Sequence, residues 1–358
     1  MKFQAMKWVV GLAVVAWGFL AQVDTAAANV GCYLYSAEVG MVCSAAEQPL
    51  PIFAAPVQPL NSPLRVLTHA RQADNANVYS EPNGSIVRNV GDGYLFASLQ
   101  GQTQVDGVTW YQINPGEWMK ASDLTMATPT TFQGVTLLRQ PPRPFGWVVT
   151  RNGFYPSHEP AGEPDTALGK MNRYDFFEVY DAVVDEEGWL WYDLGDGRWI
   201  RQTEVSLVDV KQRPAEVGPD EYWTEVDLYE QTFAAYEGDR MVFATLISSG
   251  LNRWPTHEGI FQVFDRWVKN KMSGAEGLVD YYFIEDINHI MYFDPDMEIA
   301  LHGAFWHDRF GYKHSHGCVN MVPTDAEWVY NWSAQADNDL WVWVHTSDPN
   351  HYFDVYDN

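Results

Sequence analysis

The sequence predicts a mainly β protein that is divided into several small domains. Aromatic residues make up 15% of the 358 residues, which favours strands over a helical bundle. Short apolar runs that alternate with polar residues are separated by Gly, Asn, Asp and Pro. A pattern of aromatic and acidic residues also recurs at an offset of 81 residues. Together these observations predict two small β-barrels followed by a larger β domain with a short helix.

The charge balance excludes one class of partner. The chain has 47 acidic and 22 basic residues, and its net charge is −25. A protein that binds nucleic acid needs a cationic surface to neutralise phosphates, so no nucleic-acid partner is expected. An anionic membrane surface would repel the protein for the same reason.

Residues 1–28 have the composition of a signal peptide. Lys2 and Lys7 give a positive start, Trp8 to Leu20 is an unbroken apolar run, and Ala26 to Ala28 supplies the small residues of a cleavage site. We therefore expect an exported protein, in the cell wall, the periplasm or outside the cell. No stable membrane span is expected after cleavage, and an uncleaved N-terminal anchor is the alternative.

Residues 29–63 are predicted to form a linker rich in proline. Cys32 and Cys43 lie close together in the sequence there and could pair in an oxidising compartment. Cys318 is then left over, and an odd cysteine in an exported protein indicates a reactive thiol.

The repeat predicts two related modules, which we call module 1 (residues 64–128) and module 2 (residues 140–210). Trp110-Tyr111 and Trp118 of module 1 recur as Trp191-Tyr192 and Trp199 of module 2. This arrangement resembles bacterial SH3-like modules. The resemblance implies binding or positioning rather than catalysis.

Residues 220–347 are predicted to form a third, larger domain. Trp223 to Gln231 and Met241 to Ser248 alternate as two strands would, and a turn is expected at Ala235 to Asp239. A helix is expected from Thr324 to Trp332, because Thr324 and Glu327 have the spacing of a capping box.

The segment from Leu301 to Met321 contains the residues most suited to chemistry. Four of the ten histidines lie in it, beside the unpaired cysteine: His302, His307, His314, His316 and Cys318. An imidazole can take the proton of a thiol and leave a nucleophilic thiolate. Because acidic residues outnumber basic ones in this domain, we expect an imidazolium partner to offset their effect on the thiolate. Two alternatives are a zinc site that uses His302, His314, His316 and Cys318, and an inert buried thiol.

The same residues carry a resemblance to a known family. His302-Gly303 followed by Ser315-His316-Gly317-Cys318-Val319-Asn320 resembles the signature of the YkuD-type L,D-transpeptidases. The resemblance spans residues 220–346, and His257 replaces a proline that is usual in the family. It implies a β-sandwich-like catalytic domain with the cysteine in a cleft, and a reaction that needs no metal and no other cofactor.

The resemblance also implies roles for individual residues. Cys318 would be the nucleophile, His302 would be the general base, and the Gly303 carbonyl would orient His302. Ser315 and His316 would shape the turn that carries the nucleophile. The amides of Gly317 and Cys318 would form an oxyanion hole.

Other residues of the domain are expected to surround the site. We expect Asn320 to brace the turn or to touch substrate, and Tyr292 to line the cleft or to pack in the core. Trp306, His307 and His314 are expected on the rim of the cleft, as surface rather than catalytic residues, where Trp306 could contact substrate.

The predicted function is that of an exported enzyme whose partners are peptidoglycan stem peptides. Cys318 would form a thioester with a donor stem and transfer it to an amine. Hydrolysis of the thioester, which would make the protein an L,D-carboxypeptidase, uses the same residues and is an alternative. A wall-binding protein without catalytic activity is another.

Overall fold

The computed structural model describes residues 68–274, 277, 279–336 and 339–347, together with residues 52–53 and two short strands near the N-terminus. These two strands are β1 (Cys32–Ser36) and β2 (Gly40–Cys43), which pair so that Cys32 lies opposite Cys43 in the backbone register. The two cysteine side chains, the predicted signal peptide and most of the predicted linker lie outside the described residues. Within the described residues, no helix is both long and apolar enough to cross a membrane.

Module 1 consists of two antiparallel sheets that share an apolar core. One sheet has the order β5-β4-β9-β8-β7, and the other contains β10, β3 and β6. The core joins both sheets through small and aliphatic side chains such as Ala97 and Ile113. The strands are β3 (Thr68–Gln72), β4 (Asn77–Tyr79), β5 (Ile86–Asn89), β6 (Tyr94–Leu99), β7 (Gly101–Val105), β8 (Val108–Asn114), β9 (Glu117–Lys120) and β10 (Leu124–Met126).

Module 2 is also built from short antiparallel strands. Its two sheets have the orders β13-β12-β17 and β14-β15-β16. The strands are β12 (Phe145–Val148), β13 (Phe176–Glu178), β14 (Asp181–Val184), β15 (Leu190–Asp193), β16 (Trp199–Arg201) and β17 (Val205–Val208). Phe53, from the segment predicted to be a linker, packs against Phe145 and Phe176 of this module with ring centroids 4.9 and 4.7 Å apart.

The sequence repeat corresponds to a repeated local structure. Trp110 pairs with Lys120 between β8 and β9, and Trp191 pairs with Arg201 between β15 and β16, so both pairs keep the same register. Each hairpin continues into a 3₁₀ turn and then a final strand. The 3₁₀ turns are η2 (Ala121–Asp123) and η4 (Gln202–Glu204), with η3 (Thr166–Leu168) elsewhere in module 2.

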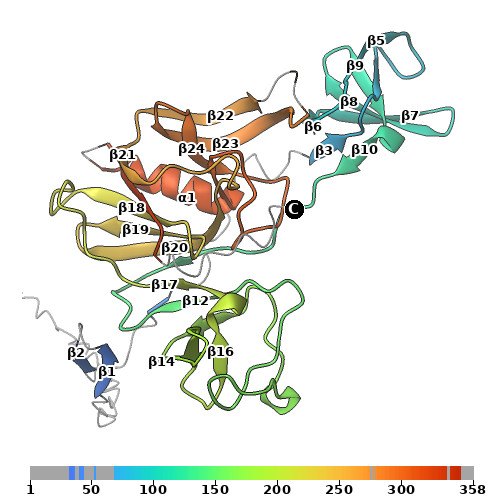
Figure 1. Ribbon diagram of the computed structural model, residues 1–358. Helices are drawn as coiled ribbons and strands as arrows, with labels where there is room; N and C mark the ends of the chain where they lie inside the picture. The colour runs from blue at the N-terminus through green and yellow to red at the C-terminus, as the bar shows by residue number, and fades with distance from the viewer. Residues whose placement is uncertain are drawn as a thin grey trace, which may run out of the picture.

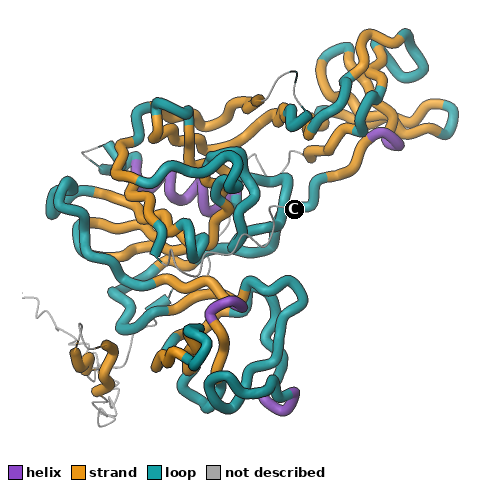
Figure 2. The backbone as a smooth tube through the Cα atoms, in the orientation of Figure 1, coloured by secondary structure: helices purple, strands orange, loops and turns teal. Residues whose placement is uncertain are grey.

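The C-terminal domain packs its strands around a single helix, α1 (Pro323–Ser333) (Figure 1). Ala326, Val329 and Trp332 of α1 join an apolar core with side chains of the surrounding strands. The strands are β18 (Tyr222–Asp227), β19 (Thr232–Glu237), β20 (Arg240–Ser248), β21 (Gly259–Gln262), β22 (Asp265–Gly274), β23 (Tyr282–Asp294), β24 (Ile299–Gly303), β25 (Val319–Met321) and β26 (Trp341–His345). The prediction of a mainly β chain with a short helix is confirmed, as Figure 2 shows.

Two predicted boundaries in this domain differ from the structure. The predicted turn at Ala235 to Asp239 is confined to Gly238 and Asp239, because Ala235 to Glu237 belong to β19, and the chain makes an additional, earlier turn at residues 228–231. The Asp227 carboxylate accepts hydrogen bonds from the Tyr229 and Glu230 amides at 2.9 and 3.2 Å and so holds that earlier turn. The helix begins at Pro323 rather than Thr324. Its N-cap is Val322, which makes no side-chain cap hydrogen bond, and proline at the first helical position is favourable.

Both modules contact the C-terminal domain, but in different ways. Strand β6 of module 1 pairs in parallel with β23, so the sheet of the C-terminal domain continues into module 1. Phe96 of β6 also packs in an apolar cluster with Ile284 and Phe305 of that domain. Module 2 shares a different apolar core with it, in which Phe145 packs with Trp223 and Phe310. The segment between the modules contributes a third contact, since β11 (Val135–Thr136) pairs with β20.

Candidate active site

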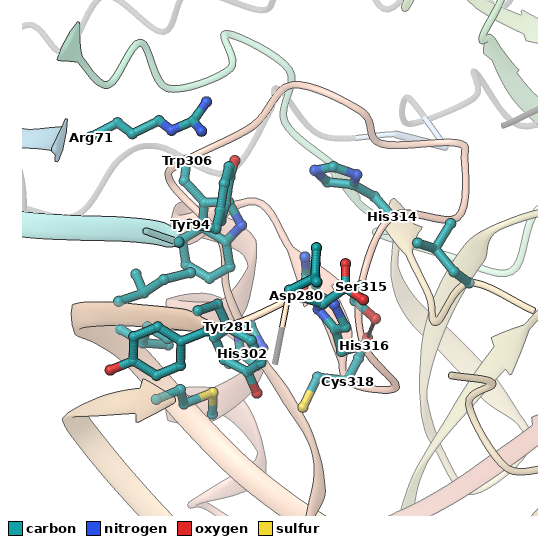
Figure 3. Close-up of a pocket in the computed structure, with 18 of the residues that line it drawn as sticks. Arg71, Tyr94, Asp280, Tyr281, His302, Trp306, His314, Ser315, His316 and Cys318 are labelled. Carbon is teal, nitrogen blue, oxygen red and sulfur yellow. Dashed lines mark hydrogen bonds between the residues drawn. The ribbon is translucent and has the colours of Figure 1, made fainter. Parts of the chain in front are cut away.

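His302 lies on β24, Cys318 directly precedes the neighbouring strand β25, and both face the same cavity. Strands β24 and β25 pair in parallel, with His302 opposite Asn320. Side chains that are paired in this register, or two residues apart along a strand, point to the same face of a sheet. His302, Cys318 and Asn320 line one cavity of about 440 Å³. Figure 3 shows His302 and Cys318 in it.

The His302 ring is held by its own strand. Its Nδ1 lies 3.2 Å from the carbonyl oxygen of Gly303 and donates to it, so Nε2 is the nitrogen left as an acceptor. The ring is 2% exposed, and burial lowers the pKa of His302 to about 4. A side chain at Gly303 would displace Asn288, because a Cβ there would lie 2.3 Å from the Asn288 Oδ1.

Cys318 is a neutral thiol in the free protein. It is partly exposed, and burial raises the pKa of Cys318 to about 11, against a smaller lowering by a hydrogen bond with the Ala300 backbone. With the His302 pKa at about 4, thiol and imidazole are both uncharged near neutral pH. Burial thus disfavours the charged form of both groups, including the imidazolium partner expected from the sequence.

The turn before Cys318 is held by two hydroxyl groups. Ser315 Oγ donates to the Cys318 carbonyl oxygen and accepts from the Gly317 amide at 3.2 Å. Thr256 Oγ1 donates to the Gly317 carbonyl oxygen at 2.6 Å. Gly317 has φ +118°, a backbone conformation that side chains disfavour, so this turn requires glycine. Ser315 has the expected shaping contacts, whereas the Gly317 amide is engaged by Ser315 rather than free to form an oxyanion hole.

His316 lies at the exposed edge of the cavity. Its ring centroid is 3.9 Å from that of Trp254 and 5.1 Å from that of Tyr282. Burial against these rings lowers the pKa of His316. The side chain thus fills space beside the turn, between two aromatic rings.

Asn320 connects the cavity to a buried histidine. Its side-chain amide lies 2.8 Å from His307 Nε2, and the Arg309 amide donates to His307 Nδ1 at 3.1 Å. The prediction of a surface position for His307 is therefore wrong, since the ring is 7% exposed and hydrogen-bonded at both nitrogens. His314 and Trp306 line the cavity, as expected for its rim.

Tyr292 is not among the residues that line this cavity. It packs against the same core cluster as Cys318 does, which corresponds to the second of the two positions expected for it. Tyr282, ten residues earlier on β23, lines the cavity instead.

The residues of the alternative zinc site do not gather their donor atoms. Elsewhere in the part of the chain that the structure describes, three possible ligands do have donor atoms within 4.8 Å of one another. They are Glu225, Asp227 and His345. In that group His345 Nε2 is 2.8 Å from Glu225 Oε1, so the side chains already pair.

Module 2 holds the loop that joins the two halves of the motif. Tyr312 donates its hydroxyl hydrogen to the Val149 carbonyl at 3.0 Å, and Tyr174 donates to Asp308 at 2.7 Å. Arg173 also donates to the Phe310 carbonyl at 3.4 Å. This loop carries Trp306 and His314, so module 2 supports one wall of the cavity.

Sequence reasoning missed the residues that module 1 contributes to the cavity. Arg71 and Tyr94 line it together with His302 and Cys318. These residues lie more than 200 positions from the motif, and the sequence pattern contains no signal that β6 pairs with β23.

Comparison with known proteins assigns the C-terminal domain to a family. Residues 221–345 match the YkuD family, described as the L,D-transpeptidase catalytic domain. The chain is 28% identical over 141 residues to a Bacillus subtilis (strain 168) protein named "Putative L,D-transpeptidase YciB", an alignment that covers 37% of this chain and 68% of that protein.

Solved structures that are described as L,D-transpeptidases are also similar to this chain. An Enterococcus faecium L,D-transpeptidase mutant is 24% identical with a TM-score of 0.31, and the match covers 35% of this chain and 50% of that one. An L,D-transpeptidase from Mycobacterium smegmatis is 19% identical with a TM-score of 0.31, and the match covers 45% of this chain and 79% of that one. This chain thus spans half the length of the Enterococcus protein.

Proposed function

Because residues 221–345 form a YkuD L,D-transpeptidase catalytic domain, we propose that the protein is a peptidoglycan L,D-transpeptidase that uses Cys318 as nucleophile and His302 as general base. The observation that carries this proposal is the shared cavity of the two side chains, with the His302 Nδ1 bound to the Gly303 carbonyl. That hydrogen bond directs the free Nε2 to act as the proton acceptor.

The first half of the reaction forms a thioester. The Cys318 sulfur attacks the carbonyl carbon between an L-centre and a terminal D-residue of a donor stem peptide, while His302 Nε2 takes the thiol proton. His302 then gives this proton to the leaving nitrogen as the carbon–nitrogen bond breaks. The D-amino acid leaves, and the acyl group stays on sulfur.

The second half transfers the acyl group. An acceptor amine attacks the thioester carbon, and the carbon–sulfur bond breaks. His302 carries the proton from the amine nitrogen to the departing sulfur, which restores the neutral pair.

The neutral resting pair sets the timing of proton transfer. A thiol pKa of about 11 and an imidazole pKa of about 4 make a free thiolate rare before substrate binds. The proton therefore moves as the carbon–sulfur bond forms, which is general-base catalysis rather than attack by a preformed thiolate.

We also propose that the protein is exported. The support is compositional: the positive start, the apolar run from Trp8 to Leu20 and the small residues from Ala26 to Ala28. A peptidoglycan substrate lies outside the cytoplasmic membrane, which agrees with this location.

The proposal predicts that Cys318→Ala abolishes the acyl-enzyme and that His302→Ala slows its formation by about 10²–10⁴-fold. Intact-mass analysis after incubation with a donor tetrapeptide measures the adduct. Mass spectrometry of the products, with and without an acceptor amine, separates transfer from hydrolysis.

His158→Ala is the matched control, because His158 is an exposed histidine of module 2 that pairs with Asp165. It should acylate at the parent rate. An adduct on the Cys318→Ala protein would contradict the proposed nucleophile, and a hydrolysed product alone in the presence of amine would contradict transfer.

A further inference from the structure

Module 1 is fixed against the catalytic cavity by backbone hydrogen bonds. Strands β6 and β23 pair in parallel, with Tyr94 opposite Tyr282. The Tyr94 amide donates to the Tyr281 carbonyl at 2.9 Å, and the Ser98 amide donates to Glu285 Oε2 at 3.1 Å. The edge of module 1 that borders the cavity is thus part of the same sheet as the catalytic domain.

This edge places a cation in the cavity. Arg71 on β3 is exposed, and its guanidinium carbon lies 5.1 Å from the centre of the Tyr94 ring. Both side chains line the cavity that contains His302 and Cys318. Figure 3 shows Arg71 at one end of the cavity view and Cys318 at the other, so Arg71 is well separated from the reacting sulfur.

Arg71 differs from most arginines of this acidic chain. Most arginines of the described residues pair with a carboxylate: Arg88, Arg143, Arg173, Arg198, Arg201, Arg213, Arg240 and Arg253. The other five arginines of the described residues form no ion pair there: Arg71, Arg139, Arg151, Arg266 and Arg309. Of these, only Arg71 lines the cavity. Arg71 and Arg309 both act on the Tyr94 phenol, whose pKa they lower against the larger effect of burial.

The carboxylates of the cavity already have partners. Asp280 pairs with Arg253 at 3.7 Å. Asp74 accepts from the Gly93 amide at 3.4 Å, and Asp92 accepts from the side-chain amide of Asn75. Arg71 is therefore a lining cation that forms no ion pair with a carboxylate of the described residues, although Asp74 and Asp92 keep their charges in the same cavity.

An unpaired guanidinium in a partly enclosed cavity is suited to a carboxylate ligand. Its planar fork matches the two oxygens of a carboxylate, which allows two parallel charge-assisted hydrogen bonds. The chain carries a net charge of −25, so an anionic ligand needs a local cation to offset the repulsion of the rest of the molecule.

We propose that Arg71 of module 1 binds a side-chain carboxylate of the donor peptide, so that module 1 is part of the donor-binding site. The inference rests on the proposed function. The separation of Arg71 from Cys318 means that the carboxylate belongs to a donor residue away from the bond that is cleaved. Arg71 is a specificity-determining residue and takes no part in proton transfer.

The test measures donor binding without chemistry, in the full chain with Cys318→Ala. Two synthetic donor peptides are compared, which are identical except that one has a side-chain carboxylate and the other a carboxamide in its place. Calorimetry should show that Arg71→Gln raises the Kd of the carboxylate peptide about tenfold and changes the Kd of the amidated peptide by less than about twofold. Arg71→Lys, which keeps the charge but not the planar fork, should give a smaller loss than Arg71→Gln.

Arg139→Gln is the control, because it removes the same charge from an exposed position outside the cavity. It should bind both peptides as the parent does. An unchanged Kd for the carboxylate peptide in Arg71→Gln, an equal loss for both peptides, or no binding of either peptide to the parent would each overturn the inference. Failure of the proposed function would appear in a different measurement, as the absence of an acyl-enzyme from the intact mass of the protein that keeps Cys318.

Discussion

Modules 1 and 2 have the same local structure but attach to the catalytic domain through different physical contacts. Their hairpins keep one register, with Trp110 opposite Lys120 and Trp191 opposite Arg201. Module 1 attaches through backbone hydrogen bonds between β6 and β23, and also through an apolar cluster in which Phe96 packs with Ile284 and Phe305. Module 2 attaches through a shared apolar core that includes Phe145.

The difference separates positioning from support. The pairing of β6 with β23 brings Tyr94 at the start of β6, and Arg71 on the neighbouring strand β3, to the catalytic cavity. An apolar interface excludes water and fixes the loop behind the cavity without lining the cavity itself. A repeat in the sequence therefore predicts a shared local structure, but it does not predict a shared role.

The largest expected effect tests whether module 2 and the catalytic domain unfold as one unit. Phe145→Ala should lower the free energy of unfolding by about 3–5 kcal/mol, because it removes a buried ring from the shared core. The loss should appear in the transition of the catalytic domain as well as in that of module 2. Thermal unfolding, followed both by tryptophan fluorescence and by loss of acyl-enzyme formation, measures it.

Ile113→Ala provides the comparison in module 1. Ile113 is fully buried in a core that contains no side chain of the catalytic domain. The substitution should destabilise module 1 by about 2–5 kcal/mol while the transition of the catalytic domain stays in place. If both substitutions shift the catalytic transition equally, the core that Phe145 shares with the catalytic domain is no more coupled to that domain than the core that lies within module 1.

Local signals in the sequence predicted much of the site. His302, Gly303, Ser315 and Cys318 form a short motif. The structure places β24, which carries His302 and Gly303, beside β25, which directly follows Cys318. The Gly303 carbonyl lies where it was expected, against the His302 ring. Such a motif can be read because its residues are close in the sequence and their chemistry is distinctive.

Contacts between distant backbone segments could not be predicted in this way. The pairing of β6 with β23 uses N–H and C=O groups that every residue except proline carries, so it has no signature in side chains. Arg71 and Tyr94 therefore remained outside the predicted site. His307 was missed for a related reason, because its burial depends on hydrogen bonds with Asn320 and the Arg309 amide that form only in the folded chain.

The segment between the modules allows a second test, because a buried carboxyl holds it. The Gly134 amide and the Thr245 hydroxyl both donate to Asp325 at the start of α1, with the Gly134 bond at 3.0 Å. Burial raises the pKa of Asp325 to about 7 from its ordinary 3.8. This contact is therefore sensitive to pH, in contrast to the apolar contact of module 2.

The sign of the pH effect follows from the raised pKa. The unfolded chain releases the Asp325 proton near pH 4, whereas the folded chain keeps it until about pH 7. The free energy of unfolding should therefore fall between these values and level off above them. The asparagine of the Asp325→Asn variant cannot ionise. The free energy of unfolding of this variant, minus that of the parent, should therefore rise across that window by at most about 4 kcal/mol.

Urea unfolding at several pH values between 4 and 8 measures this difference. Asp220→Asn is the control, because Asp220 is an exposed carboxyl of the same region. A constant difference between Asp325→Asn and the parent across the range would show that Asp325 ionises alike in the folded and unfolded chain.

The smallest expected effect separates the polar part of the module 2 contact from its apolar part. Tyr312→Phe removes the hydroxyl that donates to the Val149 carbonyl at 3.0 Å and keeps the ring. The free energy of unfolding should fall by about 1 kcal/mol, the usual net contribution of one hydrogen bond, as measured by urea unfolding.

Tyr155→Phe of the same module is the control, since the described residues provide no hydrogen-bond partner for its hydroxyl. A loss as large as that of Phe145→Ala would mean that hydrogen bonds to the loop, rather than the shared apolar core, hold module 2 in place.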